Sequence, residues 1–154
     1  MKEHLDETNL EILRILQADG SITNADLSRK IGLKPPSVLQ RVRKLEQLDL
    51  IKGYTAHLNA EELGFGLTIF AQVSLALHQD QPIENFVNSV SGIPEVLEVH
   101  HVSGEFDFLL RIVVQNMRHY EQLIRDRLSS IKGMGKLQSC FVLASPKESY
   151  ALPI

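Results

Sequence analysis

The sequence predicts an α+β protein, with an N-terminal helix-turn-helix three-helix domain and a C-terminal ferredoxin-like βαββαβ domain. Within the first fifty residues, apolar side chains recur at helical spacing in three segments separated by turn signals. The later segments alternate between strand-like and helix-like patterns in the order β-α-β-β-α-β. A chain of 154 residues can hold two small domains. We place the first domain at 1–52, a hinge strand and linker at 53–64, and the second domain at 65–154.

The first two helices have recognisable ends. Asp6 is a good N-cap for the first helix, which should end at Gly20 in the left-handed conformation. Thr23 and Asp26 have capping-box spacing at the start of the second helix, with Asp in place of the usual Glu. Gly32 then supplies the turn that ends this short helix.

The third helix should begin at Pro36, because Pro35 precedes another proline and is thereby pushed out of the α region. One side of this helix is aliphatic and should pack on the other two helices: Val38, Val42 and Leu45. The opposite side is polar: Ser37, Gln40 and Lys44, flanked by Arg41 and Arg43.

The segment Arg29–Lys44 holds six Lys/Arg and no Asp/Glu, although the whole chain has 16 basic and 19 acidic residues. Such residues on a helix often form only a solvated face. Here the small Ser28, the turn Gly32 and the aliphatic Val38 have helix-turn-helix spacing, which favours a contact with double-stranded DNA. The expected DNA contacts are Arg29, Lys30, Lys34, Pro36, Ser37, Gln40, Arg41, Arg43 and Lys44. Of these, Ser37, Gln40 and Arg41 could reach base edges, and Lys30, Lys34, Arg43 and Lys44 could meet phosphates.

The second domain should contain four strands and two helices. "LTIFAQVSLAL" alternates, with Leu67, Ile69, Ala71, Val73, Leu75 and Leu77 on one face. "QPIENFVNSV" is a helix with an apolar stripe of Ile83, Phe86, Val87 and Val90. "EVLEVHHV" and "DFLLRIVV" are strands, followed by a helix capped by Asn116 with Met117, Tyr120, Ile124, Leu128 and Ile131 inward, and by the strand "KLQSCFVLA".

The face of the sheet away from the helices would carry Phe70, Gln72, Ser74 and Ala76 from the first strand. This face is mixed and weakly charged, which makes it a candidate for sheet-to-sheet dimerisation. An antiparallel sheet can equally leave one face in solvent.

Several classes of site find no support. His100 and His101 are neighbours on a strand and point to opposite faces, so no metal site is expected there. Cys140 should be an inert buried thiol, and one cysteine cannot form an intrachain disulfide. No phosphate loop, carboxylate pair or nucleophile elbow is present, so we expect no catalysis and no cofactor. No apolar run is long enough for a membrane span, and the acidic "MKEHLDETNL" does not resemble a signal peptide, which predicts a cytoplasmic protein.

"HVSGEFDF" joins two predicted strands and could bind an amino acid. Gly104 would expose backbone N–H groups to the ligand carboxylate, and Asp107 would offer a fixed carboxylate to its ammonium group. From chemistry alone, an ordinary hairpin loop is the favoured interpretation.

With both halves placed, the sequence resembles the Lrp/AsnC family, the feast/famine transcription regulators. The resemblance covers nearly the whole chain and rests on "LDETNLEILRILQADGSITNADLSRKIGL", "VLQRVRKLEQLDLIKGYTAHLN" and "VSGEFDFLL". It implies a DNA-binding domain joined by a hinge strand to an effector-binding and oligomerisation domain, with dimers that assemble to octamers. It also implies an amino-acid effector bound between dimers by Ser103, Gly104, Glu105, Phe106 and Asp107, with Gly135, Leu137, Gln138 and Ser139 from a neighbouring subunit.

Three residues depart from the family pattern. Asn9 replaces an Asp, Lys34 replaces a serine N-cap at a cost of about 1 kcal/mol, and Asp49 replaces a glycine. The last two leave open an alternative, an amino-acid-binding oligomer with weak or lost DNA binding. A small enzyme on the ferredoxin-like domain is a third hypothesis, which no converging acid–base pair supports.

Overall fold

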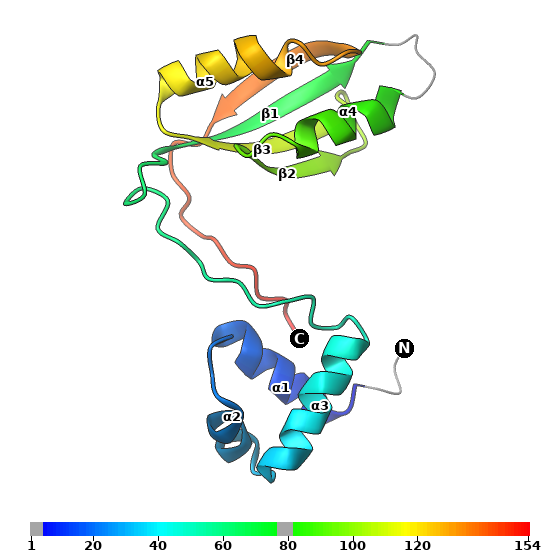
Figure 1. Ribbon diagram of the computed structural model, residues 1–154, viewed down its shortest axis with the longest axis vertical. Coiled ribbons are helices and arrows are strands. Elements are labelled where there is room, and N and C mark those ends of the chain that lie inside the picture. The colour runs from blue at the N-terminus through cyan, green and yellow to red at the C-terminus, as the bar shows by residue number, and fades with distance from the viewer. Residues whose placement is uncertain (1–4, 77–81) are drawn as a thin grey trace. The chain divides into compact units, whose positions relative to one another are not determined.

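The computed structural model of the chain describes residues 5–76 and 82–154 (Figure 1). Contacts divide these residues into two compact units. The first unit contains the residues up to His57 together with Lys147–Ile154, and the second unit is Leu58–Pro146. The segment 147–154 therefore packs with the N-terminal unit, although it follows the last strand in the sequence.

The first unit is built from helices α1 (Glu7–Ala18), α2 (Asn24–Ile31) and α3 (Pro35–Gln47). The two expected caps are confirmed: Asp6 accepts a hydrogen bond from the backbone N–H of Asn9, and Thr23 accepts one from that of Asp26. The core of the unit comes from all three helices: Ile12, Leu27, Val38, Val42 and Leu45. The predicted inner side of α3 is thus confirmed.

Two helix ends differ from the sequence prediction. Gly20 does not adopt a positive φ; instead the Asp19 side chain accepts hydrogen bonds from the backbone N–H and hydroxyl of Ser21. Helix α3 begins at Pro35 and not at Pro36. Its N-cap Lys34 is extended, with ψ 141, so the bend that precedes a proline falls one residue earlier than we predicted. Asp49 takes φ 56, the left-handed conformation expected where glycine is usual.

The expected hinge strand is absent from the described segment 53–59, which is extended but belongs to no sheet. A strand needs a hydrogen-bonded neighbour, and no strand of the described residues pairs with this segment. Sequence alternation alone could not show whether such a pairing forms.

The second unit contains β1 (Leu67–Leu75), α4 (Pro82–Ser91), β2 (Val96–His101), β3 (Phe108–Val114), α5 (Met117–Leu123) and β4 (Met134–Phe141). A π-helical turn, η2 (Ile124–Leu128), continues α5 within the segment predicted as one helix. The strands form one antiparallel sheet in the order β2-β3-β1-β4. The α+β class and the β-α-β-β-α-β order are confirmed.

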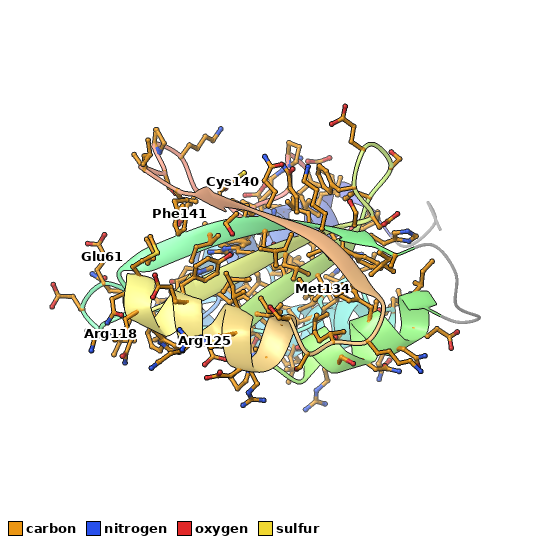
Figure 2. All side chains as sticks on the ribbon, turned by 90° about the horizontal axis from the view of Figure 1, so that it is seen from above. Glu61, Arg118, Arg125, Met134, Cys140 and Phe141 are labelled. Carbon is orange, nitrogen blue, oxygen red and sulfur yellow. The ribbon has the colours of Figure 1, made fainter. Side chains whose placement is uncertain are left out.

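The helices cover one face of this sheet (Figures 1 and 2). The buried residues of that face include Ile69, Ala71, Val73, Phe86, Phe108, Leu110 and Ile112. Two residues predicted to face inward do not: Ile83 is 44% exposed and Met117 is 49% exposed. Both lie in the first turn of a helix, where side chains point back past the start of the helix. Leu77, predicted on the inner face of β1, lies outside the described residues.

The other face of the sheet has no helix over it in the described part of the chain. It carries Phe70 and Gln72 from β1, opposite Arg111 and Leu109 of β3. On its other side, β1 places the same two residues opposite Cys140 and Gln138 of β4. We call this surface the open face.

Candidate DNA-binding face and effector site

Helix α3 presents most of its predicted contact residues to solvent. Its inner side is fixed because Val38, Val42 and Leu45 are almost fully buried. Eight of the nine predicted contact residues are exposed: Arg29, Lys30, Lys34, Pro36, Ser37, Gln40, Arg43 and Lys44. The predicted outward orientation of Ser37, Gln40 and Lys44 is confirmed, and the first two turns of α3 carry the uncharged pair Ser37 and Gln40.

The turn between α2 and α3 has the geometry that a helix-turn-helix requires. Gly32 takes φ 75, and the backbone N–H groups of Gly32 and Leu33 both donate to the carbonyl of Ser28. Ser28 is 3% exposed, so a larger side chain there would collide with the neighbouring helix. In the described structure Lys34, the N-cap of α3, makes no capping hydrogen bond through its side chain, which leaves its ammonium group exposed beside the start of α3.

Arg41 is placed differently from its neighbours. Its Nη1 donates to Asp6 Oδ2 at 2.7 Å and to Asn9 Oδ1 at 2.9 Å, and its side chain is 34% exposed. The hydrogen bond from Arg41 lowers the pKa of the Asp6 carboxyl, and the backbone N–H of Asn9 adds to this shift. Arg41 therefore ties α3 to the first turn of α1.

Arg29 is also paired, because its guanidinium binds the carboxylate of Asp26 one turn earlier on α2. Asp26 in addition accepts the hydroxyl of Thr23 at 2.6 Å. The Arg29 side chain is still 79% exposed. A phosphate could approach it without breaking the pair, since a guanidinium has five N–H donors.

In the second unit, the loop between β2 and β3 is fastened through Asp107. One carboxylate oxygen, Oδ2, accepts from the backbone N–H of Leu75 at 2.7 Å. The backbone N–H of Asp107 donates to the carbonyl of Val73 at 2.9 Å, and its carbonyl accepts from Val102 at 3.0 Å. Gly104 has φ 139, a conformation that only glycine adopts easily. Asp107 is a fixed carboxylate, as predicted, and the group that fixes it is the end of β1.

A small depression of about 70 Å³ lies beside this loop on the open face. It is lined by Gln72 and Ser74 of β1, Glu105 and Phe106 of the loop, and Lys136 and Gln138 of β4. The structure thus brings together three predicted effector residues, Glu105, Phe106 and Gln138. Gln72, Ser74 and Lys136 were not among the predicted effector residues. Lys136 lies two positions before Gln138 and so on the same face of β4, whereas the pairing of β4 with β1 brings Gln72 opposite Gln138.

Other predicted effector residues do not line this depression. Ser103 and Gly104 are exposed in the loop. Leu137 packs on the helix-covered core, and the Ser139 hydroxyl is 2.7 Å from the Tyr120 hydroxyl on α5. At Gly135, an added Cβ would lie 2.8 Å from the carbonyl oxygen of Ser74, so the glycine permits the close approach of β4 to β1.

The two histidines and the cysteine weighed in the sequence lie apart from one another in the described structure. His100 lies 2.9 Å from Glu98 on the open face, whereas His101 stacks on Phe108 at the opposite face. Cys140 is exposed, so the prediction of a buried thiol was wrong; it faces away from the helices near the end of the edge strand β4 (Figure 2). Over residues 5–76 and 82–154, no three His, Cys, Asp or Glu side chains gather closely enough to hold a metal ion.

Within the same described ranges, none of the helices combines the length and the apolar character that crossing a membrane requires.

Both units match known protein families. Residues 5–52 match the family described as "Winged helix-turn-helix DNA-binding", and residues 68–152 match the "Lrp/AsnC ligand binding domain". The chain is 34% identical over 154 residues to a leucine-responsive regulatory protein of Rhizobium meliloti (strain 1021), covering 100% of this chain and 99% of the relative. It is 37% identical over 150 residues to that of Escherichia coli (strain K12), covering 97% and 92%.

A solved structure shares the whole fold. The transcriptional regulator of Neisseria meningitidis, crystallised in complex with L-methionine, superposes with a TM-score of 0.92 and 36% identity, covering 97% of this chain and 96% of the other. Both matched domains, their order along the chain and the relatives found agree with the geometry above. The chain belongs to the Lrp/AsnC family of transcription regulators, with a helix-turn-helix DNA-binding domain and a ligand-binding domain.

Proposed function

We propose that this regulator acts in the cytoplasm and reads specific sequences in double-stranded DNA through Ser37 and Gln40. The observation that carries this proposal is the two-sided character of α3. Three aliphatic residues lock one side into the core, and the two polar side chains stand exposed at the start of the other. Residues near the start of a recognition helix are those that reach base edges in the major groove.

The surrounding cations would bind phosphates and set the register of the helix on DNA. Lys30, Lys34, Arg43 and Lys44 are exposed around the start and outer side of α3. Arg29 could join them while it keeps its pair with Asp26. Contacts of this kind supply affinity without reading sequence.

Arg41, which the sequence suggested as a base reader, is better suited to positioning. Its bonds to Asp6 and Asn9 direct the guanidinium towards α1. A base contact would require these bonds to be given up or shared. We therefore assign base reading to Ser37 and Gln40 and assign to Arg41 the angle between α3 and α1.

An amino acid would bind beside the loop 103–107. Glu105 and Lys136 line the depression with opposite charges, which suits an ammonium group and a carboxylate held apart on one ligand. The relative from Neisseria meningitidis in complex with L-methionine makes an amino acid the first class to test. By family resemblance the site would be completed between dimers.

The open face would form the dimer interface, and dimers would assemble further, to an octamer by family resemblance. Two of its charged residues are paired within the chain: Arg111 binds Glu98 at 2.8 Å, and His100 lies against the same carboxylate. Paired charges cost less to bury than single ones. In a dimer, two α3 helices could enter successive major grooves, and an effector between dimers would change which DNA sites are engaged together.

Gel shifts with sheared genomic DNA at low and moderate salt test the DNA-binding role. Wild-type protein should shift the DNA, and Lys34→Ala should weaken the shift while Lys132→Ala, an exposed cation of the second unit, should not. No shift at either salt concentration would support the alternative, an amino-acid-binding oligomer that has lost DNA binding.

A thermal-shift screen against the twenty amino acids tests the effector role, since a ligand that binds only the folded form raises the Tm. Glu105→Gln should abolish the shift given by an active amino acid, whereas Glu121→Gln on α5 should keep it. A flat response to all twenty would contradict an amino-acid effector.

A further inference from the structure

Helix α1 carries a binding surface that the DNA-binding and effector sites do not use. Gln17, on the exposed side of α1, makes two hydrogen bonds to the backbone of Leu152. Its amide oxygen accepts from the Leu152 N–H at 2.6 Å, and its amide nitrogen donates to the Leu152 carbonyl at 3.3 Å. One side chain thus satisfies both backbone groups of a residue that lies outside any sheet.

Two further contacts fix the same segment. Arg14, one turn before Gln17 on α1, donates through Nε to the carbonyl of Ile154 at 2.9 Å. Glu7 and Glu11 bind the other end of this guanidinium and so hold it in place. Tyr150 stacks on His57 with ring centroids 5.0 Å apart.

We propose that residues 147–154 form a strap that binds α1 of their own chain and limits the rotation of the DNA-binding unit. The occupant of the surface is therefore a named segment of this protein. The contacts of Gln17 and Arg14 are to the backbone of Leu152 and Ile154, so they hold the path of the chain itself.

Two segments of the chain connect the two units. The linker leaves the first unit after His57 and enters the sheet at the start of β1 (Figure 1). The connector to the strap, residues 142–146, leaves the sheet at the end of β4, the strand paired with β1. There the N–H of Val142 donates to the carbonyl of Thr68. The two units are thus joined by two segments that start on neighbouring strands. A second attachment removes orientations that a single linker would allow.

When residues 147–154 detach from α1, they stay joined to it through the connector 142–146, the paired strands β4 and β1, and the segment 58–66. Such a tether keeps the segment at an effective concentration on the order of millimolar, which favours re-binding. The segment that leads into the linker is fastened to the same unit, because the Tyr54 hydroxyl donates to Glu46 of α3 at 3.0 Å. Loss of the strap should therefore free the rotation of the unit without unfolding it.

Hydrogen exchange of the peptide 148–154 tests the binding surface in the full-length protein. Gln17→Ala should speed exchange at Leu152 about tenfold, since it removes the side-chain oxygen that accepts from the Leu152 N–H. Gln122→Ala, the same change on an exposed position of α5, should leave that exchange unchanged. Equal exchange in wild-type protein and Gln17→Ala would overturn the strap.

Time-resolved fluorescence anisotropy tests the restriction of motion. A dye is attached at Ala25→Cys, an exposed position of α2, in a Cys140→Ser background. Gln17→Ala, and separately a chain ending at Lys147, should each add a fast nanosecond component to the anisotropy decay. The labelled protein without a further change and its Gln122→Ala variant should lack this component. Faster exchange without this component would show a bound segment that restrains nothing, and would overturn the proposal. Neither measurement involves DNA, so its result is independent of the proposed regulatory function.

Discussion

The two candidate sites are built in different ways. The DNA-binding face comes from one continuous segment, residues 29–44, in which α3 fixes the direction of the side chains proposed to read bases and the end of α2 carries Arg29 and Lys30. The depression by the loop 103–107 is assembled from β1, the loop and β4, which lie far apart in the sequence. A site on one helix depends on the packing of that helix, whereas an assembled site depends on strand register and on the contacts that hold the loop.

The largest effect should come from the buried side of the continuous site. Leu45→Ala removes a side chain that is 1% exposed and should cost about 2–5 kcal/mol, because the cavity is only partly filled. Chemical denaturation should show the loss in the DNA-binding unit. Leu48→Ala, at a position that is 40% exposed, is the matched control, and an equal loss in the control would contradict the packing described here.

The assembled site should be most sensitive at Asp107. Asp107→Ala leaves the partly buried N–H of Leu75 without its acceptor and should lower the free energy of unfolding by about 1–3 kcal/mol. Asp107→Asn keeps an acceptor oxygen and should retain most of the stability. If the two variants melt at the same temperature, the bond to Leu75 does not hold the loop.

A smaller effect separates affinity from specificity on the DNA-binding face. Lys44→Ala should reduce the slope of log K against log salt by about 0.9, the value for one phosphate contact. Base preference should stay as in wild-type protein, because phosphate contacts carry no sequence information. An unchanged slope in salt titrations would remove Lys44 from the interface.

The smallest effect concerns the tie between α3 and α1. The pKa of Asp6 is lowered by Arg41, so the ion pair contributes stability above the unfolded pKa of about 4. That contribution is lost as pH falls through the lower, folded-state pKa. In an NMR titration, Arg41→Lys should move the pKa of Asp6 upward, towards its usual value. No movement would show that the pair does not exist in solution.

The same contrast explains what could be predicted from the sequence. Val38, Val42 and Leu45 recur at helical spacing, so the inner side of α3, and with it the outer side, followed from periodicity alone. Capping at Asp6 and Thr23 depends on residues three positions apart and was equally readable. Strand alternation predicted the two faces of β1 for the same reason.

Contacts between distant segments were not readable in this way. The pair of Arg41 with Asp6 joins residues 35 positions apart, and Gln17 and Leu152 are separated by 135. The family resemblance implied the neighbours of Lys136 but not Lys136 itself. Which residues of β4 share a face with Gln72 is decided by the pairing of β4 with β1. The spacing of residues within one segment does not indicate which distant segment will pair with it.

Selection of bound sequences from a random duplex library tests the central claim most directly. If Gln40 reads a base edge, Gln40→Ala should relax preference at one position by about 1–3 kcal/mol and leave the other positions as in wild-type protein. Gln47→Ala, at the far end of α3, should select the wild-type sequence. A Gln40→Ala protein that selects the unaltered wild-type sequence would contradict the assignment of base reading to the outer face of α3.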